Sequence, residues 1–217
     1  MTESILATAL SFAEMYHRGQ RRKGTTIPYV SHLMAVAALA LEGGGTKELH
    51  APAALLHDVV EDTGASVTDI KKIFGPDIAA IVKACSDASD PKNKDIWPRR
   101  KARYIRHLEK VSPDALLVSL ADKVHNASAI LSDYEQLGPK LWKRFKPESE
   151  GASGQLWYYR RLLEAFEARR RELVPGGRRL LDRLGVTVRT LQALVTEREP
   201  AAVGLSYNFG RARKSHP

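Results

Sequence analysis

The sequence of 217 residues predicts an all-α protein. Apolar residues recur at the spacing of a helix face along most of the chain, and no segment alternates clearly enough to be assigned as a β-strand. Proline and glycine residues mark where several of these segments begin and end. With 43% hydrophobic and 27% charged residues, the chain has ordinary globular composition and enough apolar material for a core.

The predicted helices follow from these signals in chain order. The segments with helical periodicity and identifiable ends are residues 3–17, 31–45, 52–64, 66–75, 76–87, 97–111, 112–138 and 154–173. Ser31 is a plausible N-cap of the second segment, and Ser66 with Asp69 three residues later is typical of a capping box. Gly138 is expected to end the longest segment. Weaker signals predict two further helices at 177–184 and 187–199.

The length suits one domain with an appendage. We expect a main helical domain over residues 1–170, a helical C-terminal extension over 171–199, and a disordered basic tail over 200–217. The net charge of +9 is concentrated near the C-terminus, since the chain from Arg169 onward holds eleven Arg and Lys residues against four Asp and Glu residues. Such a segment can bind nucleic acid or acidic ligands, although a solvated tail is the simpler interpretation.

Several classes of protein are excluded by what the sequence lacks. The single cysteine, Cys85, excludes an internal disulfide framework and a four-cysteine zinc site, and its apolar surroundings indicate a buried thiol. No apolar run approaches the roughly 18–20 residues of a membrane span, so no membrane association is expected. The N-terminus has no signal-peptide pattern. We therefore expect a cytoplasmic protein, and the sequence predicts no particular oligomeric state.

The segment "AALLHDVVEDTG", residues 53–64, places ionisable groups inside an apolar run. On a helix, His57 and Glu61 share one face, and Asp58 and Asp62 form the adjacent stripe. Carboxylates are rarely buried unless they are paired or bind a metal. The segment is therefore a candidate metal site, although a single His-Asp pair is more often a core histidine or a cap.

Two other segments supply further ligands. In "LLVSLADKVHN", Asp122 follows an apolar run and Asn126 lies four residues later, while His32 begins an alanine-rich helix. Two imidazoles and two carboxylates form a mixed nitrogen and oxygen set, which suits Mn²⁺, Fe²⁺, Co²⁺ or Zn²⁺.

Neighbouring residues have plainer interpretations. His17 is expected to cap the first helix, and His125 is expected to be structural or to face solvent, on a different face from Asp122. Lys123 either pairs with a carboxylate near the site or lies on the surface. The basic residues at 99–103 either face phosphate or form a charged helix face, and the aromatic residues around Trp157 are expected in the core.

The order of three motifs raises the metal site above these alternatives. The chain reads "HRGQRRKGTTIPYVSH", then "LLHDVVEDT", then "LADKVHN". In this order the sequence resembles the HD superfamily of metal-dependent phosphohydrolases. Within that superfamily it resembles most the RelA/SpoT-type (p)ppGpp hydrolase domain and its stand-alone small alarmone hydrolases. The resemblance covers about residues 5–165 and implies an HD-domain helical bundle.

The resemblance also implies a role for individual residues. The metal ligands would be His32, His57, Asp58 and Asp122, holding one divalent ion, usually Mn²⁺. Glu61 and Asp62 would position and deprotonate the water that the metal binds. The substrate contacts would be Arg22, Lys23, Asn126 and Tyr158, with Tyr159 as a rival to Tyr158. The family often has an arginine four residues before this tyrosine, where the present chain has Gly154.

General chemistry agrees with these roles. A divalent ion lowers the pKa of a bound water toward roughly 7, and a nearby carboxylate can accept its proton. The basic segment "RGQRRK" suits a polyanionic substrate, although a solvated surface explains the same residues.

The expected reaction is hydrolysis of the 3′-pyrophosphate of ppGpp or pppGpp to GDP or GTP and pyrophosphate. One alternative is an HD phosphohydrolase that acts on another nucleotide, such as NADPH or a deoxynucleotide. Another is a non-catalytic protein that binds a nucleotide, or nucleic acid through the basic tail.

Overall fold

The computed structural model describes residues 4–86, 96–145, 147–149 and 151–203. Its helices are α1 (Ile5–Tyr16), α2 (Val30–Glu42), α3 (His50–Leu56), α4 (Val59–Asp62), α5 (Val67–Phe74), α6 (Pro76–Cys85), α7 (Trp97–Leu108), α8 (Pro113–Leu137), α9 (Gly151–Ala168), α10 (Pro175–Arg198) and α11 (Pro200–Val203), with 3-10 turns at Gly138–Arg144, Pro147–Ser149 and Arg170–Glu172. The described residues form no β-strand, only an isolated bridge between Arg21 and Pro28. The all-α prediction is confirmed.

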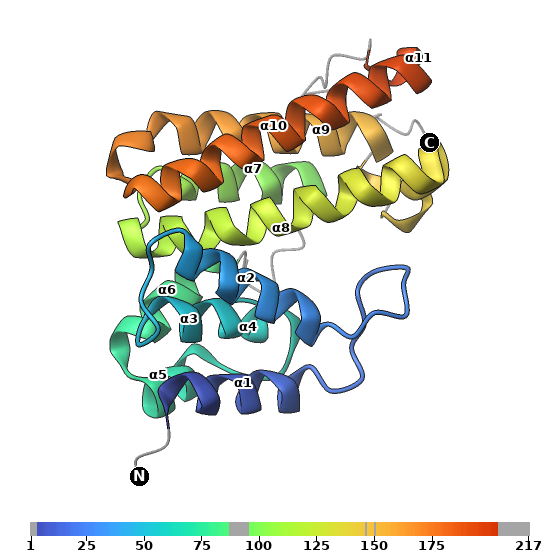
Figure 1. The fold of residues 1–217 in the computed structure, drawn as a ribbon. Coiled ribbons are helices and arrows are strands. Elements are labelled where there is room, and N and C mark those ends of the chain that lie inside the picture. The colour runs from blue at the N-terminus through green and yellow to red at the C-terminus, as the bar shows by residue number, and fades with distance from the viewer. Residues whose placement is uncertain (1–3, 87–95, 146, 150, 204–217) are drawn as a thin grey trace, which may run out of the picture.

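Helix α8 runs through the middle of the molecule (Figure 1). It packs against α2, α3 and α6 on one side and against α9 and α10 on the other. Its own side chains Leu116, Leu120 and Val124 are fully buried. Any polar side chain that α8 turns inward therefore lies at the centre of the fold, which is the position of Asp122.

The ends of α8 follow from local chemistry. The Ser112 hydroxyl accepts a hydrogen bond from the Ala115 amide at 3.2 Å, and Pro113 occupies the first turn, where its missing N–H costs nothing. Gly138 ends the helix with a φ of 54°, a conformation that favours glycine. The predicted capping box of α5 is also confirmed, because Ser66 and Asp69 exchange both side-chain to backbone hydrogen bonds.

Two predicted helices differ from the structure. The segment expected to be one helix over 52–64 is broken, because α3 ends at Leu56 and α4 begins at Val59, which leaves His57 and Asp58 at the junction. The prediction that Ser31 is an N-cap is wrong. Ser31 lies within α2, and its hydroxyl donates to the Pro28 carbonyl at 2.9 Å.

The two weak helices predicted at 177–184 and 187–199 are one helix, α10. Gly185 lowers the intrinsic helix propensity in the middle of this segment, but Leu181, Leu184 and Val188 are buried and join the same core as α2, α3 and α8. Tertiary packing therefore carries the helix through the glycine. The division at residue 170 stays a prediction, and the expected disordered tail lies outside the described residues from 204 onward.

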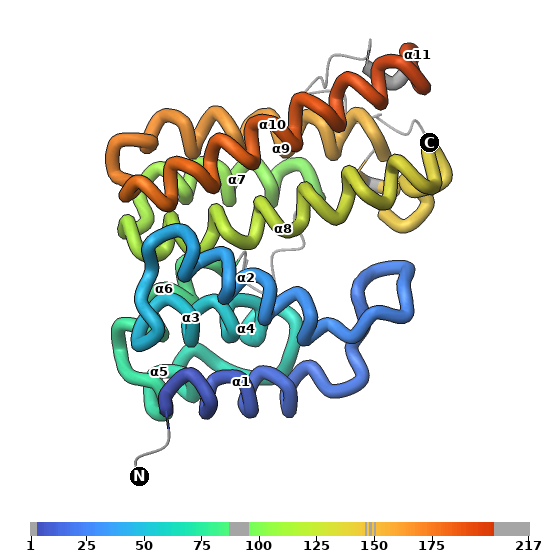
Figure 2. The backbone as a smooth tube through the Cα atoms, in the orientation of Figure 1, coloured from blue at the N-terminus to red at the C-terminus, as the bar shows by residue number. Residues whose placement is uncertain are grey.

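The connection between α1 and α2 projects from one end of the bundle (Figure 2). This connection contains the basic motif at residues 17–29. None of the helices in the described part of the chain is long and apolar enough to cross a membrane.

Candidate metal centre

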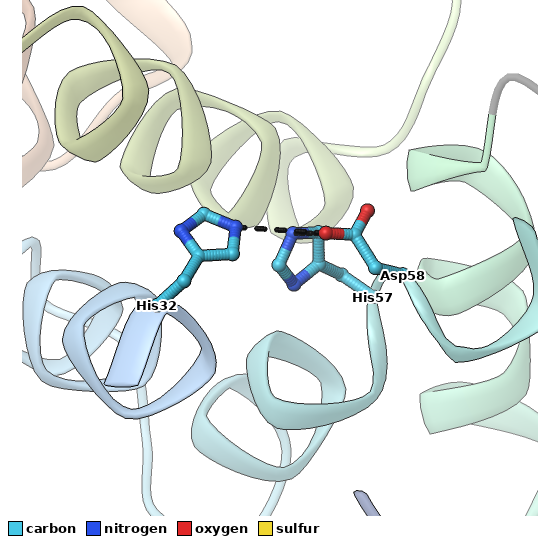
Figure 3. Close-up of side chains that lie close together, drawn as sticks. All are labelled: His32, His57 and Asp58. Atoms are coloured by element: carbon cyan, nitrogen blue, oxygen red, sulfur yellow. Dashed lines mark ion pairs between the residues drawn. The ribbon is translucent and has the colours of Figure 1, made fainter. Parts of the chain in front are cut away.

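Four side chains from three parts of the chain converge at the centre of the bundle. His32 comes from α2, His57 and Asp58 from the α3–α4 junction, and Asp122 from α8. The Nε2 atom of His32 lies 3.5 Å from Asp58 Oδ2 and 3.3 Å from Asp122 Oδ1. The Nε2 atom of His57 lies 3.0 Å and 3.6 Å from the same two oxygens. Figure 3 shows both imidazoles turned toward Asp58.

These separations fit a shared metal ion. With metal–ligand bonds near 2.1 Å, neighbouring ligand atoms on a tetrahedral or octahedral ion lie about 3.0–3.5 Å apart. His32, His57 and Asp58 form a group whose ligand atoms all lie within 4.8 Å of one another. The four residues that the sequence predicts as ligands are therefore brought together in an arrangement that could hold one ion.

The two imidazole nitrogens at this centre make no hydrogen bond. Nε2 of His32 and Nε2 of His57 are both buried, and neither has a partner in acceptable geometry, although carboxylate oxygens lie close to each. Buried polar atoms are nearly always hydrogen-bonded, so two such exceptions facing the same point need a physical reason. A bound cation supplies one, because it takes the lone pairs of both nitrogens.

The tautomer of His57 is fixed by the backbone. Its Nδ1 atom lies 2.7 Å from the Ala54 carbonyl oxygen, which can only accept a hydrogen bond. Nδ1 therefore carries a proton, and Nε2 is the atom that faces Asp58 and Asp122. A second hydrogen bond of this kind orients metal-ligating histidines in general.

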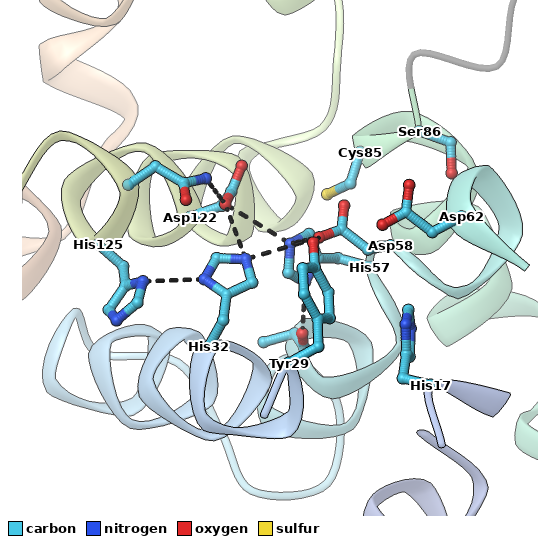
Figure 4. A network of polar contacts seen from close by, with 12 residues as sticks. His17, Tyr29, His32, His57, Asp58, Asp62, Cys85, Ser86, Asp122 and His125 are labelled. Atoms are coloured by element: carbon cyan, nitrogen blue, oxygen red, sulfur yellow. Dashed lines mark hydrogen bonds and ion pairs between the residues drawn. The ribbon is translucent and has the colours of Figure 1, made fainter. Parts of the chain in front are cut away.

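His32 is oriented by a second histidine. Its Nδ1 atom lies 2.8 Å from Nδ1 of His125, so one of the two rings must donate. Burial, together with the nearby His32 and Arg22, lowers the pKa of His125 to about 4. A neutral His125 can accept from His32 Nδ1, which leaves His32 Nε2 directed at the centre (Figure 4).

The contact between His125 and His32 was not predicted from the sequence. His125 was expected on a different face of the helix from Asp122, but residues three apart on a helix are surface neighbours. That spacing is the signal that could have found it.

The two carboxylates of this centre, Asp58 and Asp122, have partners of their own. Lys123 Nζ lies 2.5 Å from Asp122 Oδ2, and Asn126 Nδ2 donates to Asp122 Oδ1 at 2.5 Å. The hydroxyl of Tyr29 donates to Asp58 Oδ2 at 2.5 Å. Lys123 is thus paired with a site carboxylate, which decides between the two interpretations that the sequence left open.

These contacts set the charge of the centre. Burial alone raises the pKa of Asp122, but the Lys123 ammonium and the two histidines outweigh it and hold that pKa well below its ordinary value. Burial likewise lowers the pKa of His57, but Asp58 and Asp122 raise it well above its ordinary value. The two carboxylates therefore stay ionised and favour positive charge between them.

A cavity of about 640 Å³ opens onto Asp58, Asp122 and Lys123. Its size is typical of a small-molecule site. The predicted catalytic and substrate residues line it together: Arg22, Lys23, Glu61, Asp62, Asn126 and Tyr158, with Tyr159 beside them. Arg22 Nη2 donates to Asn126 Oδ1 at 2.6 Å, which ties the basic loop to α8. Both tyrosines are buried, so the structure does not choose between Tyr158 and Tyr159.

Other residues of the cavity were not predicted with it. Tyr29 and Tyr104 line the wall, and Lys101 is the member of the basic 99–103 cluster that does so. The Lys101 ammonium lies 5.3 Å from the centre of the Tyr158 ring. The cavity thus combines cations with aromatic faces, a mixture that suits a nucleotide with its phosphates.

Gly154, where the resemblance to the RelA/SpoT-type hydrolases led us to expect an arginine, has no room for a side chain. A Cβ atom built there would lie 1.8 Å from the Ser149 carbonyl oxygen. The close approach of α9 to the preceding turn therefore requires glycine, and this position contributes no charge to the cavity.

The fold and the site together define a helical bundle with a histidine–aspartate centre of the HD type. The HD domain family model matches residues 9–145, and the chain belongs to this family. The predicted HD-domain helical bundle is confirmed.

Two of the similar proteins come from animals and share one name. The chain is 40% identical over 135 residues to guanosine-3′,5′-bis(diphosphate) 3′-pyrophosphohydrolase MESH1 of Drosophila melanogaster. The aligned region covers 61% of this chain and 71% of that protein. It is 31% identical over 188 residues to the protein of the same name from Homo sapiens, with 84% and 96% covered.

Solved structures give the same result. One, described as a metazoan orthologue of SpoT that hydrolyses ppGpp and plays a role in starvation responses, has a TM-score of 0.66 at 31% identity. The superposition covers 85% of this chain and 95% of the chain in that structure. Another, lmo0812 from Listeria monocytogenes EGD-e, has a TM-score of 0.61 at 27% identity and covers 73% and 96%.

Proposed function

We propose that this protein hydrolyses the 3′-pyrophosphate of ppGpp or pppGpp. The observation that carries the proposal is the pair of unpartnered Nε2 atoms, on His32 and His57, facing Asp58 and Asp122 beside a cavity with basic and aromatic walls. The names of the relatives, which are pyrophosphohydrolases of this nucleotide, support the choice of substrate.

We propose that His32, His57, Asp58 and Asp122 hold one divalent ion, with Mn²⁺ as the first candidate. When bound, the ion supplies positive charge to the phosphoryl oxygens and makes a nearby water more acidic. The protein's own part is to keep both imidazole lone pairs directed at one point, through the Ala54 carbonyl and through His125.

Glu61 and Asp62 act as the proton acceptors. Both lie on α4, one turn after the ligand pair, and both line the cavity. A carboxylate there takes a proton from the attacking water as its oxygen bonds to the phosphorus on the 3′-oxygen. The bond from that phosphorus to the 3′-oxygen breaks, the 3′-oxygen takes up a proton, and pyrophosphate leaves.

Arg22, Lys23 and Asn126 bind and orient the nucleotide, and Tyr158 lines the same cavity. Arg22 offers a planar set of donors suited to phosphate, and its hydrogen bond to Asn126 holds the side chain at the cavity. Phosphoryl transfer needs mainly positioning and positive charge, which these residues supply.

The test is release of pyrophosphate from ppGpp by purified protein with Mn²⁺. We expect release that EDTA abolishes and that Asp58→Asn abolishes, since the amide keeps the shape of the ligand without its charge. NADPH and dGTP serve as comparison substrates. If the protein turns over NADPH or dGTP with metal but does not hydrolyse ppGpp, the assignment of substrate is wrong and the metal centre still stands.

Two expectations from the sequence remain predictions. One is a cytoplasmic location. The other is a solvated basic tail, with nucleic acid as the alternative partner for that tail. Removing the residues after 203 leaves the helices described here intact. A protein that binds its ligand through the tail should then lose binding, whereas a hydrolase should keep its turnover.

A further inference from the structure

A chain of two hydrogen bonds runs from the end of α1 to a carboxylate of the cavity. Nδ1 of His17 lies 2.7 Å from Gln20 Oε1, and Gln20 Nε2 donates to Asp62 Oδ2 at 2.9 Å. In Figure 4 the His17 ring is turned toward Asp62. His17 is the C-cap residue of α1, as expected, but its side chain does more than end a helix.

The direction of this chain follows from the carboxylate. An ionised carboxylate only accepts hydrogen bonds, so the NH₂ group of Gln20 must face Asp62. The carbonyl oxygen of Gln20 then faces His17 and also only accepts. Nδ1 of His17 must therefore carry a proton and donate it. A single arrangement of the amide and the ring satisfies both contacts.

His17 is a fixed anchor for this chain. Its side chain is buried, with 4% of the residue exposed, and its ring stacks on Tyr29 with 5.0 Å between the ring centres. Its other nitrogen, Nε2, is buried without a hydrogen-bond partner. An apolar ring would fill the same space without leaving a polar atom unsatisfied, so the useful atom of this imidazole is Nδ1.

The same segment also holds the neighbouring carboxylate. Tyr29 donates its hydroxyl to Asp58, and the Tyr29 amide donates to the Gln20 carbonyl at 3.0 Å. Gln20 and Tyr29 are thus locked to each other by the backbone while their side chains reach Asp62 and Asp58. Asp62 itself is exposed and sits at the end of a helix of four residues, so α4 alone restrains it little.

We propose that His17 and Gln20 are positioning residues that aim the Asp62 carboxylate at the attacking water. The inference rests on the proposed function, because it gives Asp62 the role of proton acceptor. His17 acts through Gln20, and Gln20 acts through Asp62. The segment at 17–29 therefore holds the proton acceptor Asp62 and the ligand Asp58 in a fixed position relative to each other.

The kinetic test uses Gln20→Met, which keeps the length of the side chain and removes both hydrogen bonds. We expect kcat for ppGpp to fall by about 10- to 100-fold, the order of loss that follows a misplaced catalytic group. KM and the amount of Mn²⁺ bound per chain should not change. Gln136→Met is the matched control, since Gln136 is an exposed residue of α8, and it should leave kcat unaltered.

A double-mutant cycle separates a relay from two independent structural effects. His17→Phe alone should lower kcat by about 10-fold, but in the Gln20→Met background it should cost nothing further, because the contact it acts through is already gone. Losses that multiply, or a Gln20→Met enzyme with normal kcat, would overturn the proposal.

The tautomer of His17 gives a measurement that needs no turnover. ¹⁵N NMR of the ring should find Nδ1 protonated in the natural protein and should lose that single form in Gln20→Met. If the Nδ1 proton is present but ppGpp is not hydrolysed, the proposed function fails while the hydrogen-bond chain stands. If Nδ1 is not protonated, the positioning proposal fails whatever the enzyme hydrolyses.

Discussion

The Nδ1 atoms of His32 and His125 lie 2.8 Å apart, so a histidine outside the predicted ligand set contacts a histidine inside it. The contact leaves His32 Nε2 directed at Asp58 and Asp122. The centre is therefore organised by more residues than the four that face it, and His125 has a role that its own position in the cavity wall does not suggest.

The first prediction concerns this contact. His125→Leu removes the acceptor that orients His32, so Mn²⁺ should bind about 10- to 100-fold more weakly, as is typical when the partner of a metal-ligating histidine is lost. Titration with Mn²⁺ followed by EPR gives the affinity. His125→Asn, whose amide oxygen can accept the same proton, should recover part of the loss.

The control for this prediction is His107→Leu on α7, whose side chain is exposed and donates a hydrogen bond to the Ala84 carbonyl at 3.1 Å. It should bind Mn²⁺ as the natural protein does. Equal affinities in the His125→Leu variant and the natural protein would show that His32 needs no partner.

The second prediction concerns metal removal. A metal bound only by the folded state stabilises it, by about 2.7 kcal/mol when the free metal is 100 times its dissociation constant. We expect Mn²⁺ to raise the Tm of the natural protein and EDTA to reverse the change. His57→Ala should show no response to either, and a Tm shift that persists in this variant would place the ion elsewhere.

The four proposed metal ligands could be found from the sequence because each lies in a short motif with a fixed spacing. His57 and Asp58 are adjacent, and Asp122 follows an apolar run that predicts a buried helix. The apolar neighbours in both motifs forced these polar groups into the core, where only a partner or a metal accounts for them. The helices that carry His32 and Asp122 were predicted as well, whereas the single helix predicted for His57 and Asp58 is broken at these two residues.

The supporting contacts were not predictable in the same way. The bond from Gln20 to Asp62 joins residues 42 positions apart, and the bond from Arg22 to Asn126 joins residues 104 apart. Local periodicity contains no information about such pairs. The break between α3 and α4 was missed for a related reason, since the sequence there has no glycine or proline and the turn is set by the packing of His57 and Asp58 at the centre.

The third prediction concerns Lys123, whose ammonium pairs with Asp122 in the core and lies 4.8 Å from the centre of the Tyr104 ring. Lys123→Met leaves a buried carboxylate without its cation, which costs about 3–5 kcal/mol when nothing else compensates. In EDTA the variant should therefore unfold at a clearly lower urea concentration than the natural protein.

A bound divalent ion changes this balance, because it supplies positive charge to the same carboxylate. With saturating Mn²⁺ the difference between Lys123→Met and the natural protein should shrink. Lys83→Met, an exposed residue of α6, is the control and should change stability little with or without metal. An equal deficit in EDTA and in Mn²⁺ would mean that the ion does not share Asp122 with Lys123.

The last prediction concerns two glycines inside helices. A Cβ at Gly154 would lie 1.8 Å from the Ser149 carbonyl oxygen, so Gly154→Ala must push α9 from the preceding turn and should destabilise the protein by about 1–3 kcal/mol. A Cβ at Gly185 in α10 meets only the end of the Arg189 side chain, which can move. Gly185→Ala should therefore stabilise the protein by up to about 1 kcal/mol through helix propensity.

Urea unfolding of both variants tests this contrast directly. The same clash means that Gly154→Arg cannot place an arginine at this position without displacing Ser149, so we expect that variant to lose stability and to gain no activity toward ppGpp. A stable Gly154→Arg variant with faster turnover would show that α9 can move away from the turn. It would also show that the substrate of this protein, and not packing, explains why the position has no arginine.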